Sequence, residues 1–274
     1  MSIFLVLIIL IGWILSIYYG DPGILYFAVF FSLFANFFSY WYSDKIALAA
    51  SGAKKLEKND NRELWNIVEN LSITAGLPMP NIYIINDSSP NAFATGRDKE
   101  HASIAFTSGL LSILERNELE GVVAHELSHI GNRDILLQSI VVVLVGSIAL
   151  VSDILLRSMF FRGDRDNKAG GMMLIVGLVL AILSPIVATI IQLAVSRKRE
   201  FLADASGALL TRYPEGLASA LIKISANNVP MKKANNATAH LFIANPFGAK
   251  AKKGLAKLFM THPPVEDRVK ALRS

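Results

Sequence analysis

Four long apolar runs constrain this chain more than any other feature of its sequence. They cover residues 3–19, 24–42, 135–156 and 170–195. A helix needs roughly 20 predominantly apolar residues to cross about 30 Å of hydrocarbon. With 53% hydrophobic and only 18% charged residues, the chain of 274 residues is also too apolar for an ordinary soluble protein. We therefore predict two transmembrane helical hairpins, with the lipid bilayer as a partner.

The charges between the runs predict how the hairpins are oriented. Basic residues gather after the second run and after the fourth, whereas the loop between the first two runs has Asp21 as its one charge. Because cytoplasmic loops are rich in Lys and Arg, the segments that follow both hairpins should face the cytoplasm. The second hairpin has an alternative, a buried hydrophobic hairpin of a soluble fold, since its own loop contains basic residues (Arg157, Arg162, Arg165 and Lys168).

The segment between the hairpins is predicted to be an α+β domain, mostly helical, with a small antiparallel sheet. Residues 61–75 repeat apolar side chains at helical spacing and are followed by Gly76. Two short β-prone stretches, NIYII and ASIAF, are separated by NAFATGR and by polar residues. Further helices are expected at 200–211 and 214–226 after the fourth run.

The motif that indicates chemistry is HELSH, which includes His125, Glu126 and His129. In a helix both imidazoles project from one face and can bind one zinc ion at Zn–N distances of about 2.0–2.1 Å. The Glu126 carboxylate can then take a proton from water at the open coordination position. Asn117 and Glu120 resemble a capping box that would begin this helix. The alternative is a chance match with two solvated histidines.

A third ligand should come from a second helix, because the chain contains no cysteine and any metal must be held by His, Asp or Glu. The best candidate is Glu200 in SRKREFLADASG, directly after the fourth apolar run. Asp204 lies one helical turn later, where it can accept a hydrogen bond from a ligating histidine. A surface salt bridge from Glu200 to Arg197 or Arg199 is the alternative. An inserted hairpin would return the chain to the side it left and bring both halves of the site together.

Together these segments resemble the HtpX group of membrane-bound zinc metallopeptidases. The resemblance rests on HELSH, a hydrophobic hairpin, SRKREFLADA and THPPVEDR, in a chain that opens with two apolar runs, and it covers nearly the whole length. It implies a zincin-like, gluzincin-type domain with one Zn2+ per chain. His125, His129 and Glu200 would be the metal ligands, and Glu126 would be the general base. It also implies a multi-pass protein of the inner (cytoplasmic) membrane that cleaves damaged membrane proteins.

The same resemblance and the local sequence suggest further site residues. NAFATGR looks like the family's segment beside the edge strand, so Asn91, Ala92 and Phe93 would bind extended substrate backbone by strand addition. His262 in THPP would stabilise the oxyanion that forms during hydrolysis, or it is a surface-loop histidine. Arg268 would pair with Asp204 or Asp134. Asp134 would support the metal site or cap the membrane entry, and His101 and His240 are interpreted as ordinary polar residues.

These features give one predicted organisation. Residues 1–45 form a transmembrane hairpin, 46–134 the first part of the catalytic domain, 135–196 a second, transmembrane hairpin and 197–274 the second part of the catalytic domain. The expected activity is that of a zinc endopeptidase that cuts membrane or membrane-proximal proteins at the cytoplasmic face, in protein quality control. Protein substrates are the expected partners and nucleic acid is not, because the modest basic excess is explained by cytoplasmic loops. The oligomeric state stays open.

Two other functions compete with this prediction. An intramembrane protease would place HELSH inside a spanning helix, but charged residues lie within ten positions before His125 (Glu115, Arg116, Glu118 and Glu120). A non-catalytic membrane assembly or transport protein could use a structural zinc site. Such sites are closed by four protein ligands, usually with cysteine, whereas three ligands beside a glutamate leave room for a catalytic water. Catalysis is therefore favoured.

Overall fold

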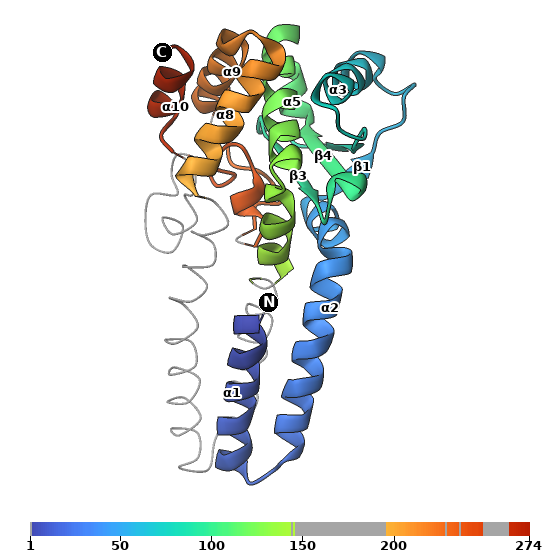
Figure 1. Cartoon of the computed structure of the whole chain (residues 1–274), viewed down its shortest axis with the longest axis vertical. Coiled ribbons are helices and arrows are strands. Elements are labelled where there is room, and N and C mark those ends of the chain that lie inside the picture. Colours follow the sequence, from blue (N-terminus) through green and yellow to red (C-terminus); the bar gives the residue numbers. More distant parts are fainter. Residues whose placement is uncertain (1, 144, 146–195, 228, 236, 249–262) are drawn as a thin grey trace. The chain divides into compact units, whose positions relative to one another are not determined.

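The computed structural model describes residues 2–143, 145, 196–227, 229–235, 237–248 and 263–274. The described residues form two compact units (Figure 1). One contains the first apolar hairpin up to Tyr42. The other contains Ser43–Val142 and the described part of Ile191–Ser274, and every candidate site residue that is described belongs to it. Most of the second predicted hairpin, 135–196, lies outside the described residues.

The first hairpin consists of two apolar helices, α1 (Ser2–Tyr19) and α2 (Gly23–Ser51). The Asp21 carboxylate accepts a hydrogen bond from the Gly23 N–H at 2.8 Å in the short turn between them. Taken singly, no helix in the described residues is both long and apolar enough to cross a membrane. The bent pair Gly23–Phe38 and Tyr40–Ser51 passes that test on length and composition alone. The transmembrane hairpins therefore stay a prediction.

A four-stranded sheet supports the second unit. Its strands are β1 (Ala53–Lys55), β2 (Asn81–Ile85), β3 (Ala92–Gly96) and β4 (Ala102–Thr107), in the order β1-β2-β4-β3. The expected purely antiparallel sheet is wrong, because β2 and β4 run parallel while the other two pairs are antiparallel. The chain reaches β3 before β4 and then turns back, so that β4 lies between β2 and β3. NAFATGR, expected between two strands, supplies β3 and hence an edge of the sheet.

Helices cover this sheet and build the rest of the unit. They are α3 (Arg62–Ala75), α4 (Ser108–Ile113), α5 (Arg116–Gly131), α8 (Arg197–Thr211), α9 (Pro214–Ala226) and α10 (Val265–Leu272), with the 3-10 turns η1 (Lys99–His101) and η2 (Ala239–Leu241). A further helix runs from Asp134 to Val143. The expected helices at 61–75, 200–211 and 214–226 are confirmed. Asn61 caps α3 through the Leu64 N–H at 3.0 Å, and Gly76 ends it with a φ of 65°.

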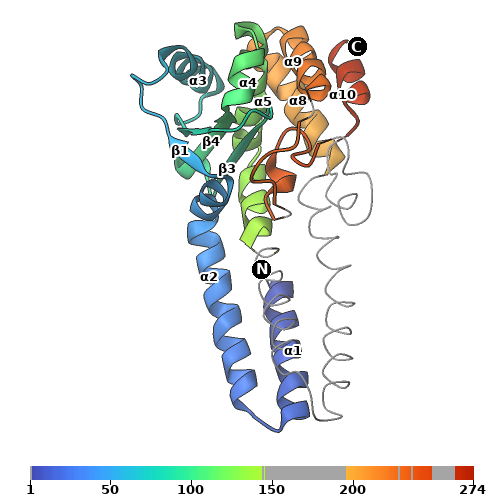
Figure 2. The same ribbon diagram turned by 180° about the vertical axis from the view of Figure 1, so that it is seen from behind.

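Helix α5 is the centre of this unit, with α8 and α9 on one side and β3 and α3 on the other (Figures 1 and 2). It is buried along almost its whole length. Glycines permit the close approach of its neighbours: a Cβ on Gly121 would lie 2.6 Å from the Leu217 nitrogen, and one on Gly207 would lie 3.0 Å from the His125 nitrogen. Helix α8 therefore packs directly against the part of α5 that contains the motif.

The expected capping box of α5 is wrong by two residues. The cap is Glu115 rather than Asn117, and the Glu118 carboxylate accepts a hydrogen bond from the Glu115 N–H at 2.8 Å. Glu118 also bonds to Ser219 and Lys223 of α9, at 2.5 and 2.8 Å. These contacts with a distant helix select the earlier start over the box that local sequence favoured.

Candidate active site

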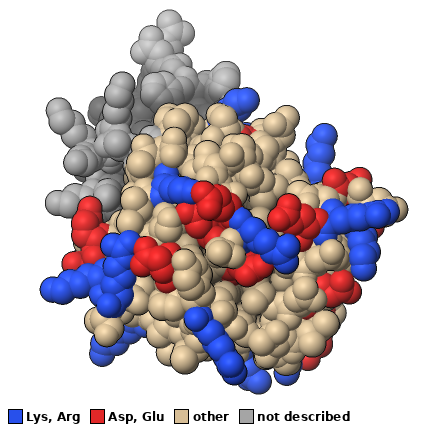
Figure 3. Space-filling model, turned by 90° about the horizontal axis from the view of Figure 1, so that it is seen from above, with Lys and Arg blue, Asp and Glu red and all other residues tan. Residues whose placement is uncertain are grey.

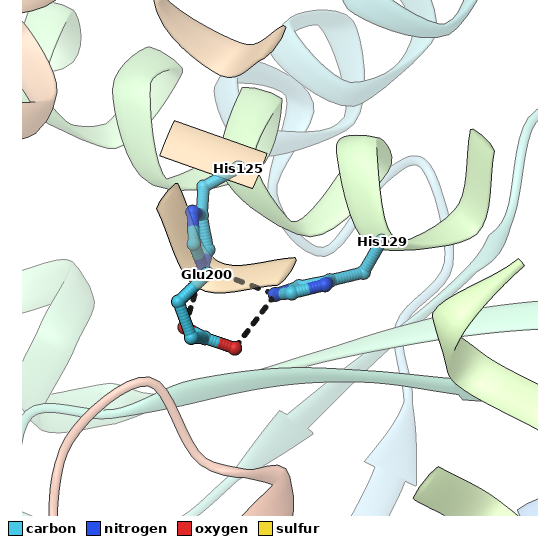
Figure 4. A group of neighbouring side chains, drawn as sticks. All are labelled: His125, His129 and Glu200. Carbon is cyan, nitrogen blue, oxygen red and sulfur yellow. Dashed lines mark hydrogen bonds and ion pairs between the residues drawn. The ribbon is translucent and has the colours of Figure 1, made fainter. Parts of the chain in front are cut away.

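Two helices bring three potential metal ligands together in the interior (Figure 4). His125 and His129 project from one face of α5, and Glu200 projects from the first turn of α8. The two Nε2 atoms are 3.2 Å apart. One oxygen of the Glu200 carboxylate lies 3.8 Å from Nε2 of His125, and the other lies 3.6 Å from Nε2 of His129. All three side chains are buried. This is the one group of three or more such ligands found in the described residues.

A carboxylate lies beside Nδ1 of each imidazole, on the side away from the other ligands. Asp204 lies 3.0 Å from Nδ1 of His125, and Asp134 lies 3.1 Å from Nδ1 of His129. An ionised carboxylate can only accept, so each one favours a proton on the Nδ1 that faces it and leaves each Nε2 directed at the other ligands. The sequence suggested this part for Asp204 and left Asp134 undecided.

Two arginines hold the carboxylates in turn. Arg268 of α10, which is 1% exposed, donates from Nε and Nη2 to the two oxygens of Asp204 at 2.8 and 2.7 Å. Of the two partners considered for Arg268, the structure shows Asp204. Arg199 donates to Asp134 at 2.6 Å. The sequence suggests Arg199 only as an alternative partner of Glu200. Arg199 and Asp134 are 65 residues apart, so no local sequence pattern predicts that they pair.

The donor set fits a divalent metal. Once both Nδ1 atoms carry their protons, the two Nε2 atoms face each other at 3.2 Å, where they can share either a proton or a metal ion. Two nitrogens bound tetrahedrally at zinc distances would be about 3.3 Å apart, close to the separation seen. The third donor is a carboxylate oxygen, and such N2O sets are typical of catalytic zinc sites.

The pKa values of the two histidines also fit a metal site. Burial lowers the pKa of His125 to about 4, although the Asp204 carboxylate beside Nδ1 opposes it, so this imidazole is neutral. Burial would also lower the pKa of His129, but Asp134, Glu200 and Glu126 raise it to about 9. Without a metal, His129 therefore keeps a proton at the place where the ligand atoms converge. A metal ion and that proton compete for one position.

Glu126 has the properties of a proton acceptor near neutrality. Burial raises the pKa of its carboxyl to about 7, with the Glu200 carboxylate adding to the effect while His129 and Arg268 oppose it. The backbone of Ala94, in β3, lies close enough to this carboxylate to lower its pKa. A group with a pKa near the working pH is well suited to accept and return a proton.

The remaining predicted site residues fall in different places. Asn91, Ala92 and Phe93 are at the start of β3 and are buried, and the Asn91 amide bonds to the backbone of Ala244 rather than facing solvent. His262 lies outside the described residues. His240 is fully buried, and its Nε2 lies 3.0 Å from the carbonyl oxygen of Gln138; its interpretation as an ordinary polar residue stays a prediction.

Comparison with known proteins identifies relatives over almost the whole chain. The model of Peptidase family M48 matches residues 58–274. A Protease HtpX homolog from Thermoanaerobacter pseudethanolicus is 47% identical over 99% of this chain and 91% of its own length. One from Pyrococcus furiosus is 47% identical over 98% of this chain and 93% of its own. The crystal structure of S. mikatae Ste24p is similar in fold, with a TM-score of 0.54 and 19% identity. The match covers 98% of this chain and 62% of that one.

Proposed function

The chain belongs to peptidase family M48 and is a metallopeptidase, and on this premise we propose that it is a membrane-bound zinc endopeptidase. In this proposal His125, His129 and Glu200 bind one zinc ion and Glu126 is the general base. The observation that supports it best is the convergence of two imidazole nitrogens and a carboxylate from α5 and α8 in a buried site, with Glu126 next in sequence to the first ligand.

The side chains can be given defined parts in peptide hydrolysis. Zinc, when bound, supplies a Lewis acid that polarises the scissile carbonyl and makes water more acidic. Glu126 takes a proton from the attacking water as the new C–O bond forms, and returns it to the amine as the C–N bond breaks. Asp204 and Asp134 keep the imidazoles oriented throughout. His262 is proposed to stabilise the oxyanion.

The proposed membrane location rests on the apolar runs and on what α2 presents outward. Large hydrophobic side chains are exposed along this helix, among them Tyr26, Phe27, Phe30, Leu33, Phe34 and Phe37. Exposed apolar surface on this scale is typical of contact with lipid or another protein. Together with the basic residues after the hairpins, it supports a catalytic domain at the cytoplasmic face of the inner membrane that acts on membrane or membrane-proximal proteins in quality control.

A protein substrate fits the charge distribution as well. On the face shown in Figure 3, basic and acidic side chains are interspersed rather than separated by sign. Nucleic-acid binding proteins concentrate positive charge on one face instead. The proposed substrates are therefore extended polypeptide segments.

The test is zinc stoichiometry together with casein hydrolysis by detergent-purified protein, wild type beside Glu126→Gln and Glu200→Ala. We expect one zinc per chain in the wild type and in Glu126→Gln, with hydrolysis in the wild type alone. Glu200→Ala should lose much of the zinc. Full zinc content in Glu200→Ala would refute the third ligand, and zinc without hydrolysis in the wild type would favour a structural zinc site.

A further inference from the structure

Strand β3 has an outer edge beside the candidate active site. Its register with β4 pairs Phe93 with Ala105 and Thr95 with Ser103, and the alternate residues Ala92, Ala94 and Gly96 direct their backbone groups away from β4. The backbone of Ala94 lies beside the Glu126 carboxylate, close enough to lower its pKa. An extended substrate that adds to this edge would therefore be cleaved close to Ala94.

Part of that edge is already paired with the chain itself. Residues 239–246, here called the edge segment, pass beside the first residues of β3. The Ile243 N–H donates to the Ala92 carbonyl at 3.0 Å. The Asn91 amide holds Ala244 on both sides, donating to its carbonyl at 2.9 Å and accepting from its N–H at 3.1 Å. Because Ile243 lies opposite Ala92 and Ala244 opposite Asn91, the segment runs antiparallel to β3, as an added strand would.

Side chains fix the edge segment in this position. Phe242 packs edge-on against Phe93, with ring centroids 5.0 Å apart and planes at 76°. Behind it, His240 lies 3.0 Å from the Gln138 carbonyl oxygen, and the Met231 N–H donates to the Pro246 carbonyl at 2.8 Å. Leu241, Phe242 and Ile243 are all at most 5% exposed. The segment is thus a packed part of the domain.

The other end of the edge is also occupied. The Ser139 hydroxyl accepts from the Gly96 N–H at 3.1 Å and lies 2.7 Å from the Thr95 hydroxyl. A substrate bound antiparallel at Ala94 would continue towards Ala92 with the residues that follow its scissile bond. Ala92 is two residues from Ala94, about 7 Å along the strand. A substrate that extends that far meets Ile243.

We propose that the edge segment competes with substrate for the Ala92 end of β3, which makes Ile243 a residue that determines specificity for substrate length. Peptides that end soon after the scissile bond bind without disturbing the segment. Peptides that extend further must displace the Ile243–Ala92 hydrogen bond to complete their own pairing with β3. This inference rests on the proposed peptidase function, and it adds a preference for substrates with little chain after the cleaved bond.

The test compares Ile243→Pro with Ile243→Val. Proline has no N–H and cannot bond to Ala92, whereas valine keeps the N–H in a side chain of similar size. Phe242, with φ −73° and ψ 139°, already has the extended conformation that a residue before proline requires. The probes are two fluorogenic peptides built on one cleavage site mapped in casein. One ends a single residue after the scissile bond, and the other continues for about five residues, enough to pass Ala92.

We expect Ile243→Pro to raise kcat/KM for the long peptide by about two- to tenfold, which is what one backbone hydrogen bond is worth, and to leave the short peptide unchanged. Ile243→Val should match the wild type with both. No gain with the long peptide, or an equal change with both, would overturn the inference. Failure of the wild type to cleave either peptide would instead refute the proposed function.

A second measurement tests the proposal even if Ile243→Pro does not fold. Hydrogen exchange of residues 239–246 is followed in zinc-loaded Glu126→Gln with and without each peptide. The long peptide should speed exchange of this segment, because binding releases the Ile243 amide, and the short peptide should not. Unchanged or slower exchange with the long peptide bound would also overturn the proposal.

Discussion

Replacement of Arg268 by methionine should destabilise the catalytic domain strongly, because it leaves a buried charge without its partner. The guanidinium and the Asp204 carboxylate share two hydrogen bonds of 2.8 and 2.7 Å, and both side chains are at most 2% exposed. Burial would raise the pKa of Asp204, but Arg268 and His125 lower it well below its usual range, so the carboxylate stays ionised in the wild type.

The magnitude follows from the burial of the pair. Removing one partner of a buried ion pair costs roughly 3–5 kcal/mol. For a unit of this size each kcal/mol lowers the midpoint of thermal unfolding by about 2–4 °C, which gives a fall of about 6–20 °C. Zinc affinity should fall as well, by about 10–100-fold, because Asp204 orients His125.

The chain offers a matched control in Arg273, which makes a two-pronged pair with Glu215 at the surface, where the two side chains are 48% and 44% exposed. Arg273→Met should hardly change the midpoint, because water solvates the remaining carboxylate. The assay is tryptophan fluorescence during heating of the metal-free protein in detergent, since bound metal would add its own stabilisation. Arg268→Met with Asp204→Asn should recover part of the loss. Equal shifts for Arg268→Met and Arg273→Met would refute the reasoning.

Three further outcomes are expected. Gly207→Ala places a Cβ 3.0 Å from the His125 nitrogen and should move α8, which should lower zinc affinity in a chelator competition. The control is Gly131→Ala, whose Cβ would meet Leu77 at 3.7 Å and should leave zinc affinity unchanged. Asp134→Asn should weaken zinc binding by about 10–100-fold through His129, and equal affinity would contradict the orienting part of Asp134. Burial raises the pKa of Glu118, but Lys223, Ser219 and the Glu115 N–H lower it below the ordinary 4.5. Because its folded pKa is depressed, Glu118 stabilises the fold above pH 4.5, and this contribution is lost as the pH falls further. Glu118→Gln should therefore unfold at a lower temperature than wild type at pH 7, and the difference should shrink below pH 4.5.

The ligand set was accessible from sequence because its parts are local. His125 and His129 are one turn apart on a single helix, and Glu200 lies in the first turn of α8, which follows an apolar run. Helical spacing predicts that the two histidines can share a metal, and the absence of cysteine together with the resemblance to the HtpX group adds Glu200; the structure brings the three side chains together. Their roles in binding and catalysis stay predictions.

The supporting contacts could not be predicted in the same way. Arg268 and Asp204 are 64 residues apart, and nothing in THPPVEDR distinguishes Asp204 from Asp134 as the partner. The parallel pairing of β2 with β4 likewise depends on where β3 lies, which is decided by long-range packing such as that of Phe93 on Phe242. The sequence does not predict strand β1, because this strand is three residues long and contains two lysines.

The ion pair between Arg199 and Asp134 has a consequence for how the chain can change in length. It joins Asp134, three residues after the end of α5, to Arg199 in the first turn of α8, with 2.6 Å between nitrogen and oxygen. Insertions or deletions in the sequence between these two residues should therefore leave the packing of α5 against α8 intact, provided that the Arg199–Asp134 ion pair is kept.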